Sequence, residues 1–180
     1  MKKRRRLEPG QNVPSFRGKT ADGVAVSLEA FKGRKVWLAF FRYASCPLCN
    51  LRVAQMIGRY DELTAEGLEI VAVVQSPPAR MGEFMGTQTP PFPIVCDPSE
   101  QLYERFGVES SLRGYAHPKN LAVMARAAKQ GFVASPKMDG TKTRLPADFL
   151  IDADGLIVDA FYASVISEHI PFDRVERFVR

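Results

Sequence analysis

The sequence predicts an α/β fold in which a central mixed sheet is flanked by helices. Continuous apolar runs of strand length occur at residues 36–41 and 68–74, as expected for strands buried on both faces. Apolar residues recur at helical spacing between them, over residues 47–65. Residues 148–162 form two apolar segments around an Ala-Asp-Gly turn, which predicts an antiparallel hairpin at the edge of the sheet.

The first part of the chain contains residues typical of turns. An Ala-Asp-Gly triplet at 21–23 separates short alternating segments within residues 11–33, which predicts an N-terminal hairpin. Ser27 is placed to cap a brief turn that stops at Gly33. The strand at 36–41 and the helix at 47–65 follow.

Helices and strands continue to alternate in the middle of the chain. Ser76 and the two prolines after it predict a short helix through Met85, and residues 91–97 predict a third strand. Asp97, Pro98 and Glu100 have the pattern of an N-cap, a first-turn proline and a capping box, so the next helix is expected to begin there and to stop at Gly107.

Residues 108–145 are a less regular insertion before the last hairpin. One helix is predicted within it, at about residues 120–130, and residues 171–180 predict a closing helix. Because binding and catalytic residues concentrate in loops that a rigid sheet positions, we expect this insertion to shape substrate access.

The basic charge is concentrated at the start of the sequence. Lys2–Arg6 contribute five cations, and the other 20 Lys and Arg balance 20 Asp and Glu. We expect residues 1–8 to form a basic, disordered tail, with transient contact to an anionic surface as the alternative. Residues 9–180 are expected to form one domain, which at this length buries roughly 70% of its unfolded surface.

No segment predicts export or a membrane span. The basic run is not followed by the apolar stretch of a signal peptide, and no window approaches the ~20 apolar residues of a membrane helix. We therefore expect a cytoplasmic protein without a specific nucleic-acid partner or a membrane partner. Three cysteines, an odd number, in a reducing compartment argue against a structural disulfide framework.

The segment FFRYASCPLCN places Cys46 and Cys49 where a predicted buried strand meets a helix. Unpaired N–H groups and partial positive charge at a helix N-terminus favour a thiolate. Pro47 fits the first turn, and Cys49 lies one turn along the same face, within disulfide reach. This pattern favours a reversible dithiol in which Cys46 is the exposed, acidic thiol.

Two other interpretations of the cysteine pair remain open. A structural zinc site needs four ligands, and Cys96, His117 and His169 supply no second clustered pair, so no metal is predicted. Two inert, buried thiols are the other possibility. Cys96 ends a predicted strand and is expected to be a small core residue rather than a second resolving thiol.

Four stretches of the sequence carry a family resemblance: ADGVAVSLEAFKGRKVWLAFFR, the cysteine segment, FPIVCDPSEQLYERFGV and RLPADFLIDADGLIVDAFY. Over roughly residues 9–180 the chain resembles the peroxiredoxin-like proteins of the alkyl hydroperoxide reductase/thiol-specific antioxidant (AhpC/TSA) family, in the thioredoxin superfamily. The resemblance implies a thioredoxin-like fold and a cofactor-free thiol oxidoreductase whose nucleophile is Cys46.

Three positions depart from the peroxidase pattern of that family. Tyr43 and Ala39 stand where it has Thr and Pro, and Pro146 stands where it has an Arg that helps to hold the peroxide. A proline there resembles thioredoxin, in which a cis-proline packs against the reactive disulfide and adjacent backbone docks the substrate. A cis Leu145–Pro146 bond would therefore be a functional feature.

Several neighbouring side chains have two possible roles. Arg42 or Arg144 is expected to lie near the thiolate and lower its pKa, with solvated surface arginines as the alternative. Tyr43 is expected either to hydrogen-bond in the site or to cover the sheet edge. His117 is expected either at the active-site mouth or in solvent, and His169 to be structural.

These features favour thiol–disulfide exchange over a dedicated peroxidase, because the peroxide-holding residues are absent. In both cases Cys46 attacks a disulfide or peroxide substrate, and Cys49 resolves the intermediate to an internal disulfide. An external thiol reductant of thioredoxin or glutathione type then reopens that disulfide. A redox-sensing domain that binds a partner according to the state of the pair is the non-enzymatic alternative.

Overall fold

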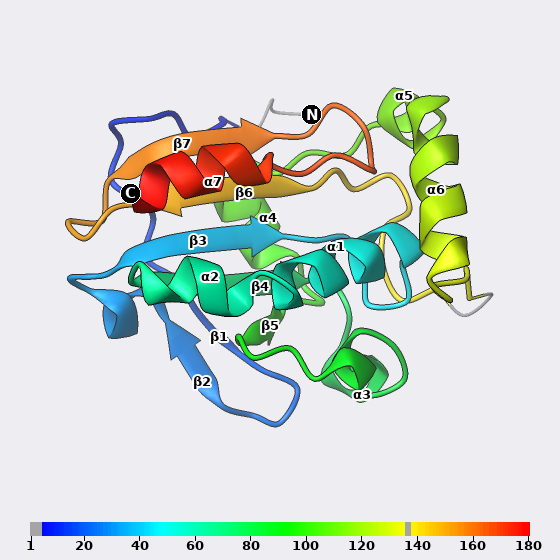
Figure 1. Cartoon of the computed structure of the whole chain (residues 1–180), viewed down its shortest axis with the longest axis horizontal. Helices are drawn as coiled ribbons and strands as arrows, with labels where there is room; N and C mark the ends of the chain where they lie inside the picture. The colour runs from blue at the N-terminus through cyan, green and yellow to red at the C-terminus, as the bar shows by residue number, and fades with distance from the viewer. Residues whose placement is uncertain (1–4, 136–137) are drawn as a thin grey trace.

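A seven-stranded mixed sheet forms the centre of the molecule, in a computed structural model that describes residues 5–135 and 138–180 (Figure 1). The strands are β1 (Arg17–Lys19), β2 (Ala25–Ser27), β3 (Lys35–Phe40), β4 (Leu68–Val74), β5 (Ile94–Cys96), β6 (Ala147–Ile151) and β7 (Ile157–Tyr162). Their order in the sheet is β2-β1-β5-β4-β3-β6-β7. β3, β4 and β5 are parallel, whereas β6 is antiparallel to β3 and to β7. The predicted mixed sheet with antiparallel edges is confirmed.

Helices cover both faces of this sheet. They are α1 (Pro47–Ile57), α2 (Tyr60–Ala65), α3 (Pro78–Met81), α4 (Gln101–Arg105), α5 (Leu112–Tyr115), α6 (Lys119–Lys129) and α7 (Phe172–Val179), with 3-10 turns η1 (Leu28–Phe31) and η2 (Met85–Gln88). In Figure 1, α1, α2 and α7 lie in front of the sheet and α4 lies behind it, while α5 and α6 stand at one end. None of the helices in the described ranges is long and apolar enough to cross a membrane.

Two hydrophobic cores, one on each face, explain why β3 is a continuous apolar run. Trp37 and Ala39 belong to the core under α1 and α7, whereas Leu38 and Phe40 belong to the core under α4. Successive side chains of a strand point to opposite faces, so a strand with helices on both sides needs apolar residues at every position.

The hairpins, the strands and two of the helices lie where the sequence predicts them. β1 and β2 form the N-terminal hairpin, and β6 and β7 form the last one around a turn that contains Gly155 with a φ of +84°. The helix expected at about 120–130 is α6, and the closing helix is α7. Short α5, at Leu112–Tyr115, was not predicted.

The single helix predicted over residues 47–65 is wrong, because α1 ends at Ile57 and α2 begins at Tyr60. The break falls at Gly58, whose N–H still bonds to the Ala54 carbonyl at 3.0 Å, and at Arg59, which has left the helical conformation. Glycine costs about 1 kcal/mol relative to alanine inside a helix, so the break comes where helix propensity is lowest.

Three smaller predictions also need correction. The helix expected from Ser76 through Met85 is the short α3 followed by η2. Ser27 precedes η1 but its side chain forms no capping hydrogen bond. The helix after Asp97 starts only at Gln101, because Glu100 has a φ of +58°; Asp97 accepts from the Gln101 and Leu102 N–H groups at 3.2 and 2.7 Å.

The basic tail expected over residues 1–8 falls partly outside the described residues, which begin at Arg5. The described part contacts the domain: the Leu7 N–H donates to the Tyr162 hydroxyl at 2.7 Å, and Arg6 pairs with Glu109 at 2.8 Å. The chain therefore joins the domain beside the start of the insertion.

Candidate active site

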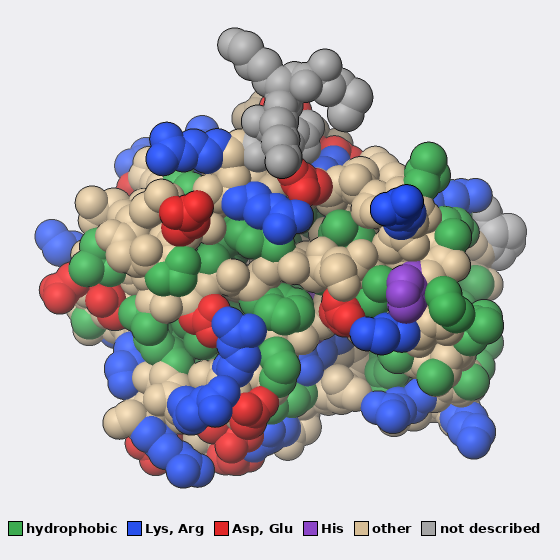
Figure 2. Space-filling view, turned by 90° about the horizontal axis from the view of Figure 1, so that it is seen from above, with side chains coloured by type: hydrophobic (Ala, Val, Ile, Leu, Met, Phe, Trp, Pro, Cys, Tyr) green, Lys and Arg blue, Asp and Glu red, His purple; other side chains and the backbone are tan. Residues whose placement is uncertain are grey.

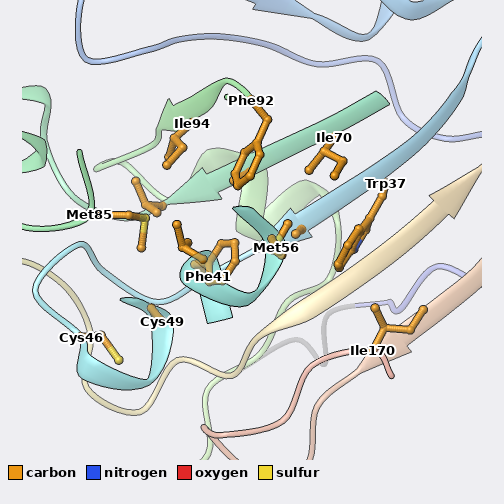
Figure 3. Close-up of a cluster of buried hydrophobic side chains, with 14 of the residues drawn as sticks. Trp37, Phe41, Cys46, Cys49, Met56, Ile70, Met85, Phe92, Ile94 and Ile170 are labelled. Carbon is orange, nitrogen blue, oxygen red and sulfur yellow. The ribbon is translucent and has the colours of Figure 1, made fainter. Parts of the chain in front are cut away.

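Cys46 and Cys49 lie together where β3 leads into α1. Cys46 is the N-cap of α1 with extended backbone, Pro47 is its first residue, and Cys49 follows in the first turn. Figure 3 shows both cysteines at the start of this helix, at the margin of the hydrophobic cluster. The expectation of an exposed Cys46 is wrong, because its exposed fraction is 0% and that of Cys49 is 1%.

The pKa values of the two thiols are shifted in opposite directions. Burial disfavours the charged form of Cys46, but hydrogen bonds from the Cys49 thiol and from two backbone N–H groups, together with the charge of Arg42, lower its pKa to about 6. Burial, the hydrogen bond to Cys46 and the charge of Cys46 raise the pKa of Cys49 well above its usual value. At neutral pH the pair is therefore a Cys46 thiolate beside a Cys49 thiol.

Of the two arginines expected near the thiolate, Arg42 is the one that contacts it. Its Nη1 donates to the Cys46 sulfur at 3.1 Å, and its backbone N–H donates to the Cys49 sulfur at 3.4 Å. Its Nη2 donates to the Lys142 carbonyl, which holds the guanidinium in place. Although burial opposes a charged guanidinium, the nearby thiolate raises the pKa of Arg42, so this side chain stays charged.

Tyr43 belongs to the site, so the first of its two expected roles describes it. Its hydroxyl accepts from Arg42 Nη2 at 3.5 Å and lies 3.8 Å from the Met138 sulfur. Burial raises the pKa of Tyr43 to about 12. The phenol is therefore a neutral hydrogen-bonding group in the wall of the site.

Arg144 does not lie at the thiolate, and it is not a solvated surface residue. Its side chain is 5% exposed and forms an ion pair with Glu100, while Nη1 donates to the Val108 carbonyl at 2.8 Å. These contacts place it behind the site, where it joins the start of the insertion to the loop before α4.

The cis bond considered for Leu145–Pro146 is absent, because the described residues contain no cis peptide bond. The Leu145 N–H donates to the Glu109 carbonyl at 3.0 Å, and the Pro146 carbonyl accepts from Ala163 N–H at 3.1 Å. Both bonds hold an extended segment that leads directly into β6, which suits the trans isomer that most X-Pro bonds adopt. Pro146 is buried and does not line the cavity at Cys46.

A cavity of about 500 Å³ opens beside the Cys46 sulfur. The cysteine segment forms one wall, and the insertion at 108–145 forms the other, as expected for a segment that shapes access. His117 lines the cavity and therefore lies at its mouth, the first of its two expected positions. The apolar residues that the insertion contributes to the lining include Tyr115, Leu121, Met124 and Met138.

A hydrogen-bonded clamp centred on Asp139 fixes the residue before the nucleophile. One carboxylate oxygen accepts from the Ser45 N–H and hydroxyl, and the other accepts from the Ser76 hydroxyl, which in turn accepts from the Ala44 N–H at 2.7 Å. A side chain at Gly140 would approach the Tyr43 Cβ to 2.8 Å, so this segment of the insertion packs directly on the site. Our sequence interpretation missed this clamp, although Asp139 is the only acidic residue between Glu109 and Asp148.

The His169 side chain is 6% exposed and has a structural role, as expected. Its Nδ1 lies 3.2 Å from an Asp148 oxygen that also accepts from the Ile170 N–H at 2.9 Å. The other Asp148 oxygen accepts from Trp37 Nε1 at 2.9 Å, and Arg52 donates to the Ile170 carbonyl at 2.6 Å. Burial lowers the pKa of His169, so the imidazole tends to stay neutral within this network.

Cys96 lies apart from the pair, at the end of β5. Partial burial raises its pKa to about 11, which makes it a poor nucleophile at neutral pH. The expected core position is met only in part, because Cys96 is half-buried and packs at the edge of the core. The residues that the structure describes include no group of three or more His, Cys, Asp or Glu side chains with the geometry of a metal site.

The chain is similar to thiol oxidoreductases over nearly its whole length. The model of the AhpC/TSA family matches residues 9–160. Peroxiredoxin Bcp of Escherichia coli is 27% identical over 165 residues, which cover 91% of this chain and 90% of that protein. The crystal structure of peroxidoxin BcpB from Mycobacterium tuberculosis has a TM-score of 0.70 at 17% identity and covers 96% of each chain. The thioredoxin domain of a thiol-disulfide oxidoreductase from Bacteroides vulgatus has a TM-score of 0.57 at 18% identity, covering 97% of this chain and 99% of that chain.

These similarities bear on the fold and on the class of reaction. The structural neighbours confirm the predicted thioredoxin-like fold. Together with the family match, the relative of 27% identity, which is named a peroxiredoxin, supports a thiol-dependent oxidoreductase.

Proposed function

The chain belongs to the AhpC/TSA family and is a thiol-dependent oxidoreductase, and we propose that it reduces hydroperoxides at Cys46. One observation supports this proposal: the buried Cys46 sulfur lies 3.1 Å from Arg42 Nη1, and Cys46 is one of the residues that line a cavity of about 500 Å³. A small hydroperoxide fits such a cavity and needs only a small opening of the segments that cover the sulfur. A disulfide on a folded protein needs a much larger opening.

Arg42 supplies the charge that the family pattern places elsewhere. The position that carries a peroxide-holding Arg in the family is Pro146 here, and this absence was the reason for preferring disulfide exchange. In this chain a guanidinium reaches the sulfur from the segment just before the nucleophile instead. Arg42 therefore stabilises the thiolate and is placed to stabilise negative charge on the oxygen that departs.

The first chemical step oxidises Cys46. Its thiolate attacks the terminal oxygen of the hydroperoxide, so an S–O bond forms and the O–O bond breaks. The departing oxygen takes a proton and leaves as an alcohol, or as water when the substrate is hydrogen peroxide. The peroxide gains two electrons, and Cys46 becomes a sulfenic acid.

Cys49 resolves this intermediate. Its pKa is raised partly by the negative charge on Cys46, and that charge is gone once the sulfenic acid has formed, so Cys49 then loses its proton more readily. The Cys49 sulfur attacks the Cys46 sulfur, an S–S bond forms, and hydroxide leaves as water with the Cys49 proton. An external thiol reductant of thioredoxin or glutathione type supplies two electrons and two protons to restore both thiols.

Thiol–disulfide exchange is the second candidate function, and the Cys-Pro-Leu-Cys spacing itself favours it. The same thiolate would attack a disulfide sulfur, expel the other sulfur as a thiolate and form a mixed disulfide that Cys49 cleaves. This route requires the segment around Asp139 to open and expose Cys46.

A direct comparison of substrates tests the proposal. The pure protein is incubated with a thiol reductant and with hydrogen peroxide, tert-butyl hydroperoxide or insulin, and the loss of reductant is measured. We expect two thiol groups of the reductant to be oxidised for each hydroperoxide supplied, little reduction of insulin, and no turnover in Cys46→Ser. Reduction of insulin without consumption of either hydroperoxide would establish disulfide exchange instead.

A further inference from the structure

The charge of the domain is balanced overall but unevenly distributed along the chain. Residues 108–145 contain seven Lys and Arg and two Asp and Glu, a net charge of +5. Residues 146–180 contain three Lys and Arg and seven Asp and Glu, a net charge of −4. The insertion that forms one wall of the Cys46 cavity is therefore strongly basic.

Three cations of the insertion are exposed and unneutralised. Arg113 lies on α5, and Arg126 and Lys129 lie on the second half of α6. All three are exposed, and none forms an ion pair within the ranges that the structure describes. Both acidic residues of the insertion are engaged elsewhere, because Glu109 pairs with Arg6 and Asp139 belongs to the clamp.

The same insertion carries the most exposed large apolar side chains of the described residues. Leu112, Leu121 and Val133 are 78%, 72% and 70% exposed. We call these residues together with the three cations the α5–α6 surface. In Figure 2 the end of the molecule formed by α5 and α6, at the right, shows green and blue side chains intermixed and little red.

The orientation of α6 leaves this surface uncovered by any element of the described residues. Asn120 and Ala127 are the buried residues of α6 and face the domain. Asn120 Nδ2 donates to the Gly114 and Tyr115 carbonyls, both at 2.9 Å, which fixes α6 against α5. Leu121 and Lys129 are on the outward side of a helix whose inner side is anchored.

We propose that the α5–α6 surface docks the protein on a bilayer that contains anionic lipids, in place of the membrane-free behaviour expected from the sequence. Aliphatic side chains that project among Lys and Arg suit the interface of an anionic membrane. A protein partner suits this surface less well, because protein interface cores are enriched in aromatic residues, whereas Leu112, Leu121 and Val133 are aliphatic.

Docking would bring the active-site cavity to the lipid. Leu121 belongs both to the α5–α6 surface and to the lining of the cavity beside Cys46. Hydroperoxides on acyl chains would then enter the cavity from the membrane. This consequence rests on the proposed peroxidase function, whereas the docking itself does not.

Vesicle binding by the full chain tests the proposal. Co-sedimentation is measured with vesicles of phosphatidylcholine alone and with vesicles that also contain phosphatidylglycerol, at low and high salt. We expect binding only to the anionic vesicles, and its loss at high salt. Because each cation near an anionic surface strengthens binding about fivefold, the Arg113→Gln/Arg126→Gln/Lys129→Gln variant should bind about a hundredfold more weakly.

Matched variants separate the α5–α6 surface from general basicity. The control Arg17→Gln/Lys19→Gln/Lys32→Gln removes three exposed cations elsewhere and should bind like the unsubstituted chain. Leu112→Ser/Val133→Ser should also weaken binding while its thermal unfolding stays unchanged, because both side chains are exposed.

Three results would overturn the docking proposal: no vesicle binding, equal losses in the α5–α6 and control variants, or binding that depends only on Lys2–Arg5. Consumption of tert-butyl hydroperoxide in the absence of vesicles is measured in parallel. It reports on the peroxidase proposal alone, so failure of one proposal is distinguishable from failure of the other.

Discussion

Replacement of Arg42 by methionine tests whether its guanidinium holds Cys46 as a thiolate. The pKa of Cys46 is about 6, against 9.0 for an unperturbed thiol. This difference corresponds to about 4 kcal/mol between the protonation states. Because burial of the sulfur opposes the shift, the hydrogen bonds and the charge of Arg42 together contribute more than this net value.

The size of the effect follows from the position of the guanidinium. An opposite charge in contact with an acid lowers its pKa by about one to three units. We expect Arg42→Met to raise the pKa of Cys46 by about one to two units, which lowers the thiolate fraction at pH 7 from about nine-tenths to between about a half and a tenth. Arg42→Lys keeps the charge without the planar fork and should show a smaller shift.

The assay is the rate of alkylation of Cys46 by a small reagent as a function of pH. In the unsubstituted protein the rate should rise as pH increases through about 6 and then level off, because the thiolate is the nucleophile. In Arg42→Met the midpoint should move to higher pH, and Cys46→Ser should remove the fast phase. An unchanged midpoint in an Arg42→Met protein that is folded normally would refute the role of the guanidinium.

Three further predictions concern Cys49, Asp139 and the tail. Cys49→Ser should still react with one equivalent of hydroperoxide but should accumulate sulfenic or over-oxidised Cys46 by mass spectrometry; full turnover with no trapped species would show that Cys49 is not the resolving thiol. Asp139→Ala leaves two hydroxyls without their acceptor, so the free energy of unfolding should fall by about 1–3 kcal/mol and Cys46 should alkylate faster; an unchanged alkylation rate would mean that the clamp does not cover the sulfur. Deletion of Met1–Arg6 removes a surface ion pair, and should change unfolding by less than about 1 kcal/mol and leave thiol activity intact; a large loss of either would contradict a peripheral role for the tail.

The parts of the fold that the sequence predicts are those in which each strand or turn has its own local signal. β3 and β4 lie between two cores, so every residue is apolar and the runs are visible without any knowledge of their partners. The last hairpin is equally clear, because its turn contains a glycine with positive φ. The break at Gly58 was missed because apolar spacing alone does not indicate where a helix ends and another begins.

The sequence predicts only those features of the candidate site that depend on residues close together in the chain. The helix N-terminus and the spacing of Cys46 and Cys49 predict an acidic thiol beside a second one, and the pKa directions agree. The burial of Cys46 was not predictable, because Asp139 reaches the site from the insertion, 94 residues after Ser45. Contacts between segments so distant in sequence leave no local pattern.

The two arginines illustrate the same limit. Arg42 precedes Cys46 and Arg144 precedes Pro146 in the sequence. The residues around them do not indicate which arginine contacts the thiolate. Arg42 reaches the Cys46 sulfur because Lys142 holds its other nitrogen, whereas Arg144 is drawn to Glu100. The outcome depends on contacts with residues far away in the sequence, Lys142 for Arg42 and Glu100 for Arg144.

Mass mapping of the oxidised protein tests the central claim most directly. The reduced chain is treated with one equivalent of hydroperoxide, the remaining thiols are alkylated, and the digested peptides are identified by mass spectrometry. We expect an intramolecular disulfide between Cys46 and Cys49, with Cys96 alkylated. A disulfide to Cys96 or to a second chain, or oxidised Cys46 beside an alkylated Cys49, would contradict the mechanism.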